Sequence, residues 1–176
     1  ANMTAIENVM VGRHLRTRAG IVGAVLRDRA TRAEESAILR RARELLEYVG
    51  IPQQAYMPAK HLAYGDQRRL EIARAMCTDP VLLCLDEPAA GLNPRESSEL
   101  SELLISIRDR HKTAVLLIEH DMSVVMQISD HVIVLDYGEK IADGTCDQVK
   151  NDPNVIAAYL GVEQDEVEAL TSEVGL

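Results

Sequence analysis

The chain has 176 residues, of which 47% are hydrophobic and 27% charged, a composition typical of a globular domain and unlike that of a disordered segment. Its net charge of −9 argues against nucleic acid as the main partner, because binding to a phosphate backbone needs an excess of Lys and Arg. No apolar stretch approaches the roughly 18 residues of a membrane span and no secretory signal opens the chain, so we expect any role at a membrane to require a partner.

The distribution of charge and the cysteine content indicate which segments are exposed and which compartment the protein occupies. Arginines crowd the segment from Arg13 to Arg43, and acidic residues without Lys or Arg fill residues 163–176; we interpret both runs as solvated surface. The three cysteines, Cys77, Cys84 and Cys146, match neither a zinc pattern nor a disulfide framework, which favours a reducing cytosol. The chain opens at Ala1 inside an amphipathic pattern, so we expect it to be the later portion of a longer protein.

The first half of the chain is predicted to be mainly helical. Apolar residues recur at helical spacing over residues 31–49, with Thr31 and Glu34 placed as a capping box and Gly50 as the end of the helix. Residues 51–62 contain two prolines and no clear period, which predicts a loop. A second helix is predicted over residues 66–77, before Asp79 and Pro80 break the chain.

Apolar runs alternate with helical stretches in the second half. Residues 81–85, 114–118 and 132–135 are continuous apolar runs, which predicts strands buried on both faces of a parallel sheet. A helix over residues 95–112 would join the first two strands as a right-handed crossover, and a shorter helix over 123–128 would precede the third. Residues 137–140 predict a hairpin turn into residues 141–142, and residues 153–160 predict a short helix. The acidic remainder is expected to be frayed or helical.

Two adjacent carboxylates, Asp86 and Glu87, follow the first apolar run. Open α/β sheets bind ligands at the carboxyl ends of their strands, and strand alternation would point the two side chains to different sides. One carboxylate could then position a metal ion and the other a water molecule. Taken alone, the pair fits a solvated turn equally well.

Four segments together indicate a family. Residues 62–69 read LAYGDQRR, residues 85–88 LDEP, residues 90–93 AGLN and residues 118–121 IEHD. In this order and at these spacings they resemble the signature motif, the Walker B strand, the D-loop and the switch histidine of the ATP-binding-cassette family. The resemblance spans essentially the whole chain and is weakest over the first sixty residues and the tail.

The resemblance implies roles for three residues. Asp86 corresponds to the carboxylate that holds Mg²⁺, commonly through water, as this ion favours carboxylate and phosphate ligands. Glu87 corresponds to the general base that polarises the attacking water in phosphoryl transfer. His120 corresponds to the histidine that contacts the γ-phosphate of ATP; a lone histidine after a strand is more often structural, and only its place in the series favours the functional reading.

The signature motif and the D-loop imply a dimer. Gly65 would open a helix whose free backbone N–H groups meet the γ-phosphate of ATP bound to a second ABC ATPase subunit, with Ala63, Tyr64 and Asp66 in the same cofactor-binding set. This chain has Ala63 where the family usually has Ser, Tyr64 where it has Gly and Asp66 where it has Gln. In the D-loop, Asn93 stands where Asp is more common. We expect Tyr64 to pack or hydrogen-bond locally.

The phosphate-binding loop G-x-x-x-x-G-K-[S/T] is absent from the 176 residues. The family's Q-loop glutamine and its adenine-stacking aromatic residue are also expected upstream of Ala1. Without them the chain would lose most of its own hold on ATP and Mg²⁺, so we expect it to be inactive alone.

The predicted fold class is α/β: a partial P-loop NTPase fold of the ABC ATPase type, with the Walker A strand and the antiparallel subdomain missing. A helical subdomain is expected over residues 1–78, the C-terminal part of the RecA-like core over 79–162 and an acidic tail over 163–176. Residues 62–76, 87–94 and 151–161 are similar to the ATPase subunits of bacterial branched-chain (hydrophobic) amino acid importers.

That similarity implies ATP hydrolysis that drives amino acid uptake at the cytoplasmic face of the bacterial inner membrane. The implied partners are a second ATPase subunit in a homo- or heterodimer, transmembrane permease subunits and, indirectly, a substrate-binding protein. Two alternatives stay open: a soluble ABC ATPase of DNA repair or translation, and a non-catalytic interaction module.

Overall fold

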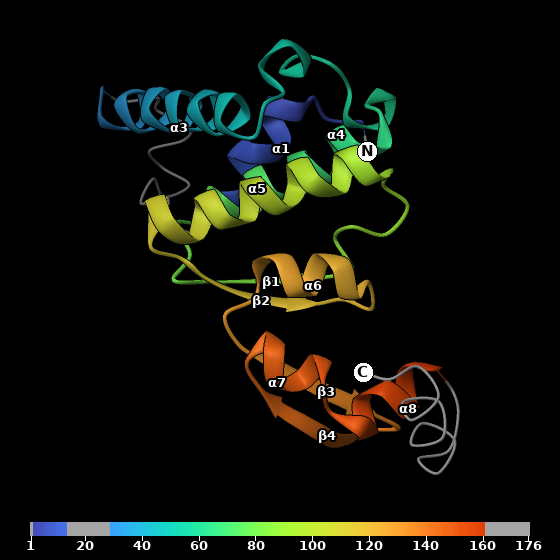
Figure 1. Ribbon diagram of the computed structural model, residues 1–176. Helices are drawn as coiled ribbons and strands as arrows, with labels where there is room; N and C mark the ends of the chain where they lie inside the picture. Colours follow the sequence, from blue (N-terminus) through green and yellow to red (C-terminus); the bar gives the residue numbers. More distant parts are fainter. Residues whose placement is uncertain (1, 14–28, 161–176) are drawn as a thin grey trace. The chain divides into compact units, whose positions relative to one another are not determined.

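The computed structural model describes residues 2–13 and 29–160 of the chain (Figure 1). Two compact units divide between Glu119 and His120, the first comprising Ala1–Glu119 and the second His120–Leu176. The predicted domain boundaries at residues 78 and 162 stay predictions. The acidic tail of residues 163–176 lies outside the described residues.

Helices dominate the first part of the first unit. Helix α1 packs against both α3 and α4, and two 3-10 turns, η2 and η3, lie in the segment predicted to be a loop. Backbone N–H groups of Ala5 and Ile6 donate to the carbonyls of Met57 and Ala55, both at 2.9 Å, and so tie α1 to that segment. The bounds are α1 Ala5–Gly12, α3 Arg29–Tyr48, η2 Pro52–Gln54, η3 Ala59–His61 and α4 Tyr64–Met76.

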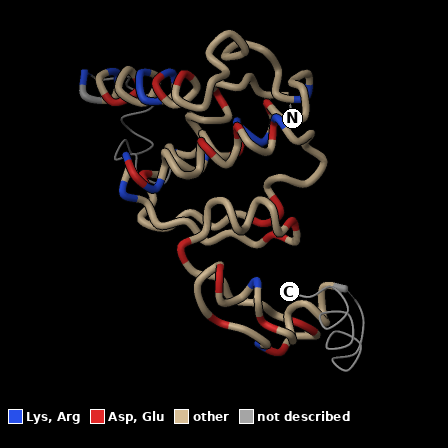
Figure 2. The backbone as a smooth tube through the Cα atoms, viewed as in Figure 1, with Lys and Arg blue, Asp and Glu red and all other residues tan. Residues whose placement is uncertain are grey.

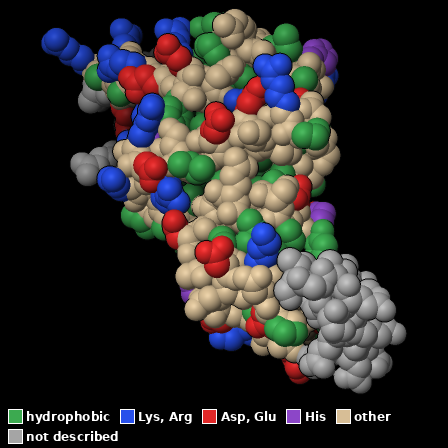
Figure 3. All heavy atoms as spheres, viewed as in Figure 1, with side chains coloured by type: hydrophobic (Ala, Val, Ile, Leu, Met, Phe, Trp, Pro, Cys, Tyr) green, Lys and Arg blue, Asp and Glu red, His purple; other side chains and the backbone are tan. Residues whose placement is uncertain are grey.

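Helix α3 differs from its prediction at the start. Thr31 lies inside the helix and is buried, so its predicted role as the N-cap is wrong. The predicted end is confirmed: Gly50 has a φ of 85°, a left-handed conformation that glycine adopts without a steric penalty. Small groups of basic and of acidic residues follow one another along α3 (Figure 2), and on the face seen in Figure 3 side chains of both signs are interspersed.

The predicted strand, helix and strand are confirmed as β1 Leu82–Asp86, α5 Pro94–His111 and β2 Ala114–Ile118. The two strands pair in parallel, with Leu82 opposite Ala114 and Asp86 opposite Ile118. The expectation of burial on both faces is wrong, since Leu82 is 50%, Leu116 54% and Ile118 58% exposed. The sequence of a strand can be continuously apolar although only one face of the strand is packed.

The second unit is built on an antiparallel hairpin. Strands β3 and β4 pair with each other, which confirms the hairpin, but the expectation that 132–135 joins a parallel sheet is wrong for the described residues. The hairpin turns at Tyr137 and Gly138, whose φ angles of 45° and 85° match the strand twist. Its bounds and those of its helices are α6 Met122–Ile128, β3 Val132–Asp136, β4 Glu139–Gly144, α7 Cys146–Lys150 and α8 Pro153–Leu160.

Each unit has its own apolar core. The first unit buries aliphatic side chains of α3, α4 and α5 almost completely, which gives the helices a common interior. The second unit packs its hairpin against α6, α7 and α8 around three buried valines. The innermost residues are Leu45, Leu46, Ile72, Met76 and Ile107 in the first unit and Val132, Val149 and Val155 in the second.

Candidate functional site

The two predicted carboxylates stand where β1 ends. Asp86 is the last residue of β1 and is exposed. Glu87 follows with a φ of 44°, in the left-handed region that residues with a side chain rarely adopt. Its N–H donates to the carbonyl of Ile118 at 2.9 Å. Strand alternation therefore extends only to Asp86, and the turn that follows sets the orientation of Glu87.

Hydrogen bonds surround this strained residue. A left-handed conformation costs about 1–2 kcal/mol for a non-glycine residue, and the turn supplies compensating contacts. The N–H of Ala90 donates to the Glu87 carbonyl at 3.1 Å. The N–H of Ala89 donates to Oε1 of Glu119 at 2.8 Å. Sequence reasoning treated Glu119 only as the neighbour of His120; the available signal was a carboxylate placed directly after a strand parallel to β1.

Asn93 begins α5. Its side chain accepts from the N–H of Glu96 at 3.0 Å, and Oε2 of Glu96 accepts from the N–H of Asn93 at 3.0 Å, which completes a capping box. Pro94 occupies the first helical position, where its missing N–H costs nothing. Asn93 therefore has a structural role beside its predicted one, and the sequence signal for it, Asn-Pro-x-Glu, is visible at residues 93–96.

The predicted cofactor-binding set lies at the start of α4. This helix begins at Tyr64, two residues before the predicted start, with Ala63 as an N-cap whose side chain donates and accepts nothing. Gly65 is thus the second helical residue, and the helix's own hydrogen bonds leave the N–H groups of its first turn unused. A Cβ at Gly65 would lie 3.2 Å from Oε1 of Glu96, so α4 and α5 approach closely here.

Tyr64 makes local contacts, which confirms its predicted packing. Its hydroxyl accepts from Arg68 at 2.8 Å, and the Arg68 guanidinium lies 5.2 Å from the ring centre in a cation–π contact. A Cβ built on Gly91 would meet the ring at 3.1 Å. The residue that replaces the family's usual glycine therefore links α4 to the turn after Glu87.

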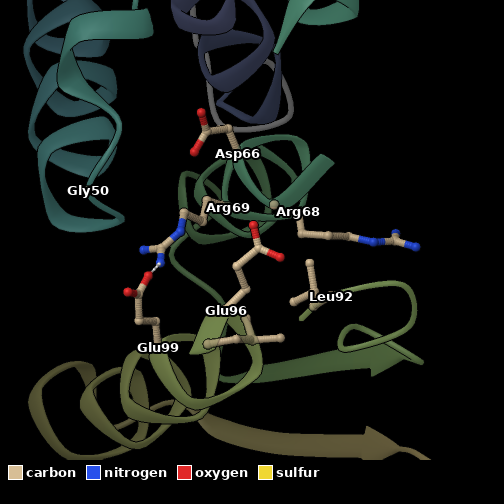
Figure 4. A pocket seen from close by; sticks show the side chains of 9 residues that line it. Gly50, Asp66, Arg68, Arg69, Leu92, Glu96 and Glu99 are labelled. Carbon is tan, nitrogen blue, oxygen red and sulfur yellow. Dashed lines mark hydrogen bonds and ion pairs between the residues drawn. The ribbon is translucent and has the colours of Figure 1, made fainter. Parts of the chain in front are cut away.

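A pocket of about 270 Å³ opens beside these residues (Figure 4). Asp66 lines it and accepts from Nε2 of Gln54 at 3.4 Å. Arg69 reaches across it to Glu99 of α5, with 2.6 Å between guanidinium and carboxylate, and also donates to the carbonyl of Val49 at 2.9 Å. One arginine thus ties together α4, α5 and the end of α3.

A second pocket, of about 230 Å³, is lined by Asp86 together with residues of α4 such as Arg68 and Glu71. Arg68 donates to Glu71 at 2.9 Å, and this hydrogen bond is the main reason that the pKa of Arg68 is raised. Within residues 2–13 and 29–160, no group of three or more His, Cys, Asp and Glu could hold a metal ion. An exposed carboxylate at a strand end fits an ion such as Mg²⁺, which keeps several waters and takes its other ligands from phosphates.

His120 is exposed and begins the second unit, whereas the other predicted site residues lie in the first. Asp121 after it is the N-cap of α6 and accepts from the hydroxyl and N–H of Ser123 at 2.6 and 2.9 Å. Both hydrogen bonds lower the pKa of Asp121, the one from the Ser123 hydroxyl more than the one from its N–H. The first unit brings together Asp86, Glu87, Asn93 and residues 63–66; a shared site with His120 stays a prediction.

Comparison with known proteins gives relatives of high identity. The chain is 50% identical over 159 residues to the high-affinity branched-chain amino acid transport ATP-binding protein LivG of Escherichia coli K12, an alignment that covers 90% of this chain and 62% of that protein. Identity to BraF of Pseudomonas aeruginosa, described by the same function, is 47% with the same coverage. The chain thus spans less than two thirds of the length of these relatives.

A solved ATP-binding cassette of an ABC transporter in its ADP conformation has the same fold, with a TM-score of 0.73 and 26% identity over 91% of this chain and 63% of that one. The predicted α/β fold of the ABC ATPase type is confirmed. The sequence profile of the branched-chain amino acid ATP-binding cassette transporters matches residues 139–165. The profile of ABC transporters matches residues 2–90, half of the chain, which therefore belongs to the ABC transporter family.

Proposed function

We propose that this chain is part of an ATPase subunit that hydrolyses ATP to drive the import of branched-chain or other hydrophobic amino acids. The names of LivG and BraF support this substrate class, as does the profile matched by residues 139–165. The conformation of Glu87 carries the proposal, because strained non-glycine residues that the surroundings hold in place cluster at catalytic sites.

Glu87 is the general base in this proposal. Its carboxylate accepts a proton from the water whose oxygen forms the new bond to the γ-phosphorus of ATP. The bond from that phosphorus to the bridging oxygen breaks, and ADP and inorganic phosphate leave. Glu87 is exposed at the end of β1, the edge of the sheet where open α/β folds bind ligands.

Asp86 is the residue that would hold Mg²⁺, through water. When bound, Mg²⁺ neutralises charge on the β- and γ-phosphates. The side chain of Asp86 is free to face such an ion because it is exposed and lines the pocket of about 230 Å³.

His120 and the start of α4 complete the proposed site. His120 contacts the γ-phosphate of the nucleotide on its own subunit. The first-turn N–H groups of α4, at Tyr64, Gly65 and Asp66, and the D-loop residue Asn93 face the nucleotide of a second ABC ATPase subunit. A helix N-terminus attracts such an anion through its unpaired N–H groups and its dipole. The active unit is accordingly a dimer.

The helices of residues 1–78 are the proposed docking surface for permease subunits, which work with a substrate-binding protein. No helix among the described residues has both the length and the apolar composition needed to cross a bilayer. The proposed location is the cytoplasmic face of the inner membrane. Recovery of hydrophobic membrane subunits with the tagged protein would support this assignment, and recovery of ribosomes or DNA instead would contradict it.

The decisive experiment is Glu87→Gln in a longer form of the protein that includes the phosphate-binding loop. Glutamine keeps the size of the side chain but accepts no proton, so we expect turnover to fall about 100-fold or more while ATP binding persists. Glu102→Gln, an exposed change on α5, is the matched control. Loss of ATP binding in Glu87→Gln, or retained turnover, would contradict the role of Glu87. The 176-residue chain alone is expected to show no turnover above background.

A further inference from the structure

Glu119 holds the turn that carries Glu87. Its Oε1 accepts from the N–H of Ala89 at 2.8 Å, although the two residues are 30 positions apart in the chain. Ala89 is buried, with 8% of its surface exposed, and Glu119 is half-buried. A hydrogen bond from a backbone N–H to a carboxylate is shorter and stronger than one between neutral groups.

This bond and a backbone hydrogen bond join the turn to the end of β2. The N–H of Glu87 donates to the carbonyl of Ile118 at 2.9 Å, and the N–H of Ala89 donates to the side chain of the next residue, Glu119. The consecutive residues Ile118 and Glu119 therefore accept hydrogen bonds from two turn residues that are two positions apart, Glu87 and Ala89. Between the two held residues lies Pro88, which is itself buried.

The two bonds differ in what they fix. The bond to Ile118 continues the parallel ladder, in which Asp86 is opposite Ile118, and its donor is a backbone N–H that every residue except proline would supply at position 87. The bond to Glu119 lies outside the ladder and fixes the chain two residues later, after the left-handed step at Glu87. A side chain is needed there because the strand itself has ended.

We propose that Glu119 is a positioning residue for Glu87: its carboxylate fixes the turn of residues 87–90 and thereby the left-handed backbone from which Glu87 reaches the attacking water. The inference rests on the proposed function of Glu87. The proposal assigns the proton to Glu87 and gives Glu119 a structural role, in which its Oε1 accepts from the N–H of Ala89. It acts through the backbone, and its neighbour His120 has a separate role.

Glu119→Ala and Glu119→Gln test the inference in the intact version that carries the phosphate-binding loop. Alanine removes the acceptor, whereas glutamine keeps an oxygen at the same reach. For Glu119→Ala we expect exchange of the Ala89 amide hydrogen, followed by NMR, to become about tenfold faster and kcat to fall about tenfold, with KM for ATP within about twofold. Glu119→Gln restores most of both values. Glu102→Ala, an exposed change on α5, leaves both unchanged.

The outcomes separate this inference from the proposed function. Loss of turnover in Glu87→Gln together with normal kcat in Glu119→Ala would overturn the inference alone. So would faster exchange of the Ala89 amide without a change in kcat. If Glu119→Gln kept the protection of Ala89 but lost kcat, the charge of Glu119 rather than its positioning would matter, which also contradicts the inference. Retained turnover in Glu87→Gln would instead overturn the proposed function, while the exchange measurement would still report on the bond.

Discussion

The ring of Tyr64 lies against Gly91, so that the first turn of α4 touches the turn that follows Glu87. A Cβ built on Gly91 would come within 3.1 Å of the ring, and the φ of Gly91 is 75°. Two regions that we propose to face the nucleotide of a second subunit, the signature motif and the D-loop, are therefore in direct contact within one subunit. A glycine at position 64, as the family usually has, would leave this contact unmade.

The contact predicts that Gly91→Ala destabilises the chain more than the same substitution at another glycine with a left-handed backbone. Both Gly91→Ala and Gly138→Ala force a left-handed alanine, at about 1–2 kcal/mol. Gly138 has a φ of 85° and no atom near its missing Cβ, so its substitution measures strain alone. We expect Gly91→Ala to cost about 1 kcal/mol more in denaturant unfolding. In a Tyr64→Ala background that excess should disappear; its persistence would exclude Tyr64 as the cause.

Substitution of His120 is expected to separate turnover from binding. In the intact version, His120→Ala should lower turnover about 100-fold while ATP binding is kept, because a group that contacts the γ-phosphate stabilises charge that develops in the transition state. His131→Ala is the control, since this exposed histidine pairs with Asp143 at 2.7 Å on the hairpin of β3 and β4. Near-normal turnover in His120→Ala would rule out the switch assignment.

Gly12 lies where α1 packs tightly against α4. A Cβ at this position would lie 2.2 Å from the backbone oxygen of Arg74, which moves only with its helix. Gly12→Ala should therefore lower the free energy of unfolding by about 1–3 kcal/mol. Val11→Ala, a change at the exposed neighbouring position, should stay within about 0.5 kcal/mol. Equal effects of the two substitutions in urea titrations would contradict the tight contact.

The ion cluster around Asp79 predicts a loss of stability in acid. Burial alone would raise the pKa of Asp79, but the hydrogen bond and charge of Arg13 and the charge of Arg41 outweigh it and lower the pKa. Both arginines pair with this carboxylate. A lowered pKa in the folded state contributes stability above the unfolded pKa of about 3.9, and that contribution is lost as the pH falls below it.

Asp79→Asn tests this pH dependence. Asparagine tolerates the φ of 48° at this position, so the substitution removes charge without adding backbone strain. The variant should be less stable than the unsubstituted chain at pH 7, and the difference should shrink as the pH falls below about 4. Arg13→Gln should produce the same trend. A difference that stays constant between pH 7 and pH 3 would show that the Asp79 charge is not the cause.

Much of the fold was predictable because it depends on local patterns. Helical spacing predicted α5 and α8 to within about one residue, and apolar runs predicted β1 and β2 together with their parallel pairing. The start of α3 was misplaced because the spacing Thr-x-x-Glu, seen at Thr31 and Glu34, can occur inside a helix as well as at its start. Strand β3 was misassigned because an apolar run does not distinguish a parallel partner from the hairpin strand that follows it.

By itself the sequence determined where the candidate site residues stand in the order of elements: Asp86 and Glu87 at the end of one strand, His120 after the next, and Gly65 in the first turn of a helix. Each of these depends on residues within a few positions of one another. The tertiary structure decided how Glu87 is held, through the bond between Glu119 and Ala89, and how Tyr64 meets Gly91. Those pairs form only when the parallel pairing of β1 with β2 and the packing of α4 bring distant segments together, and no local period in the chain encodes such contacts.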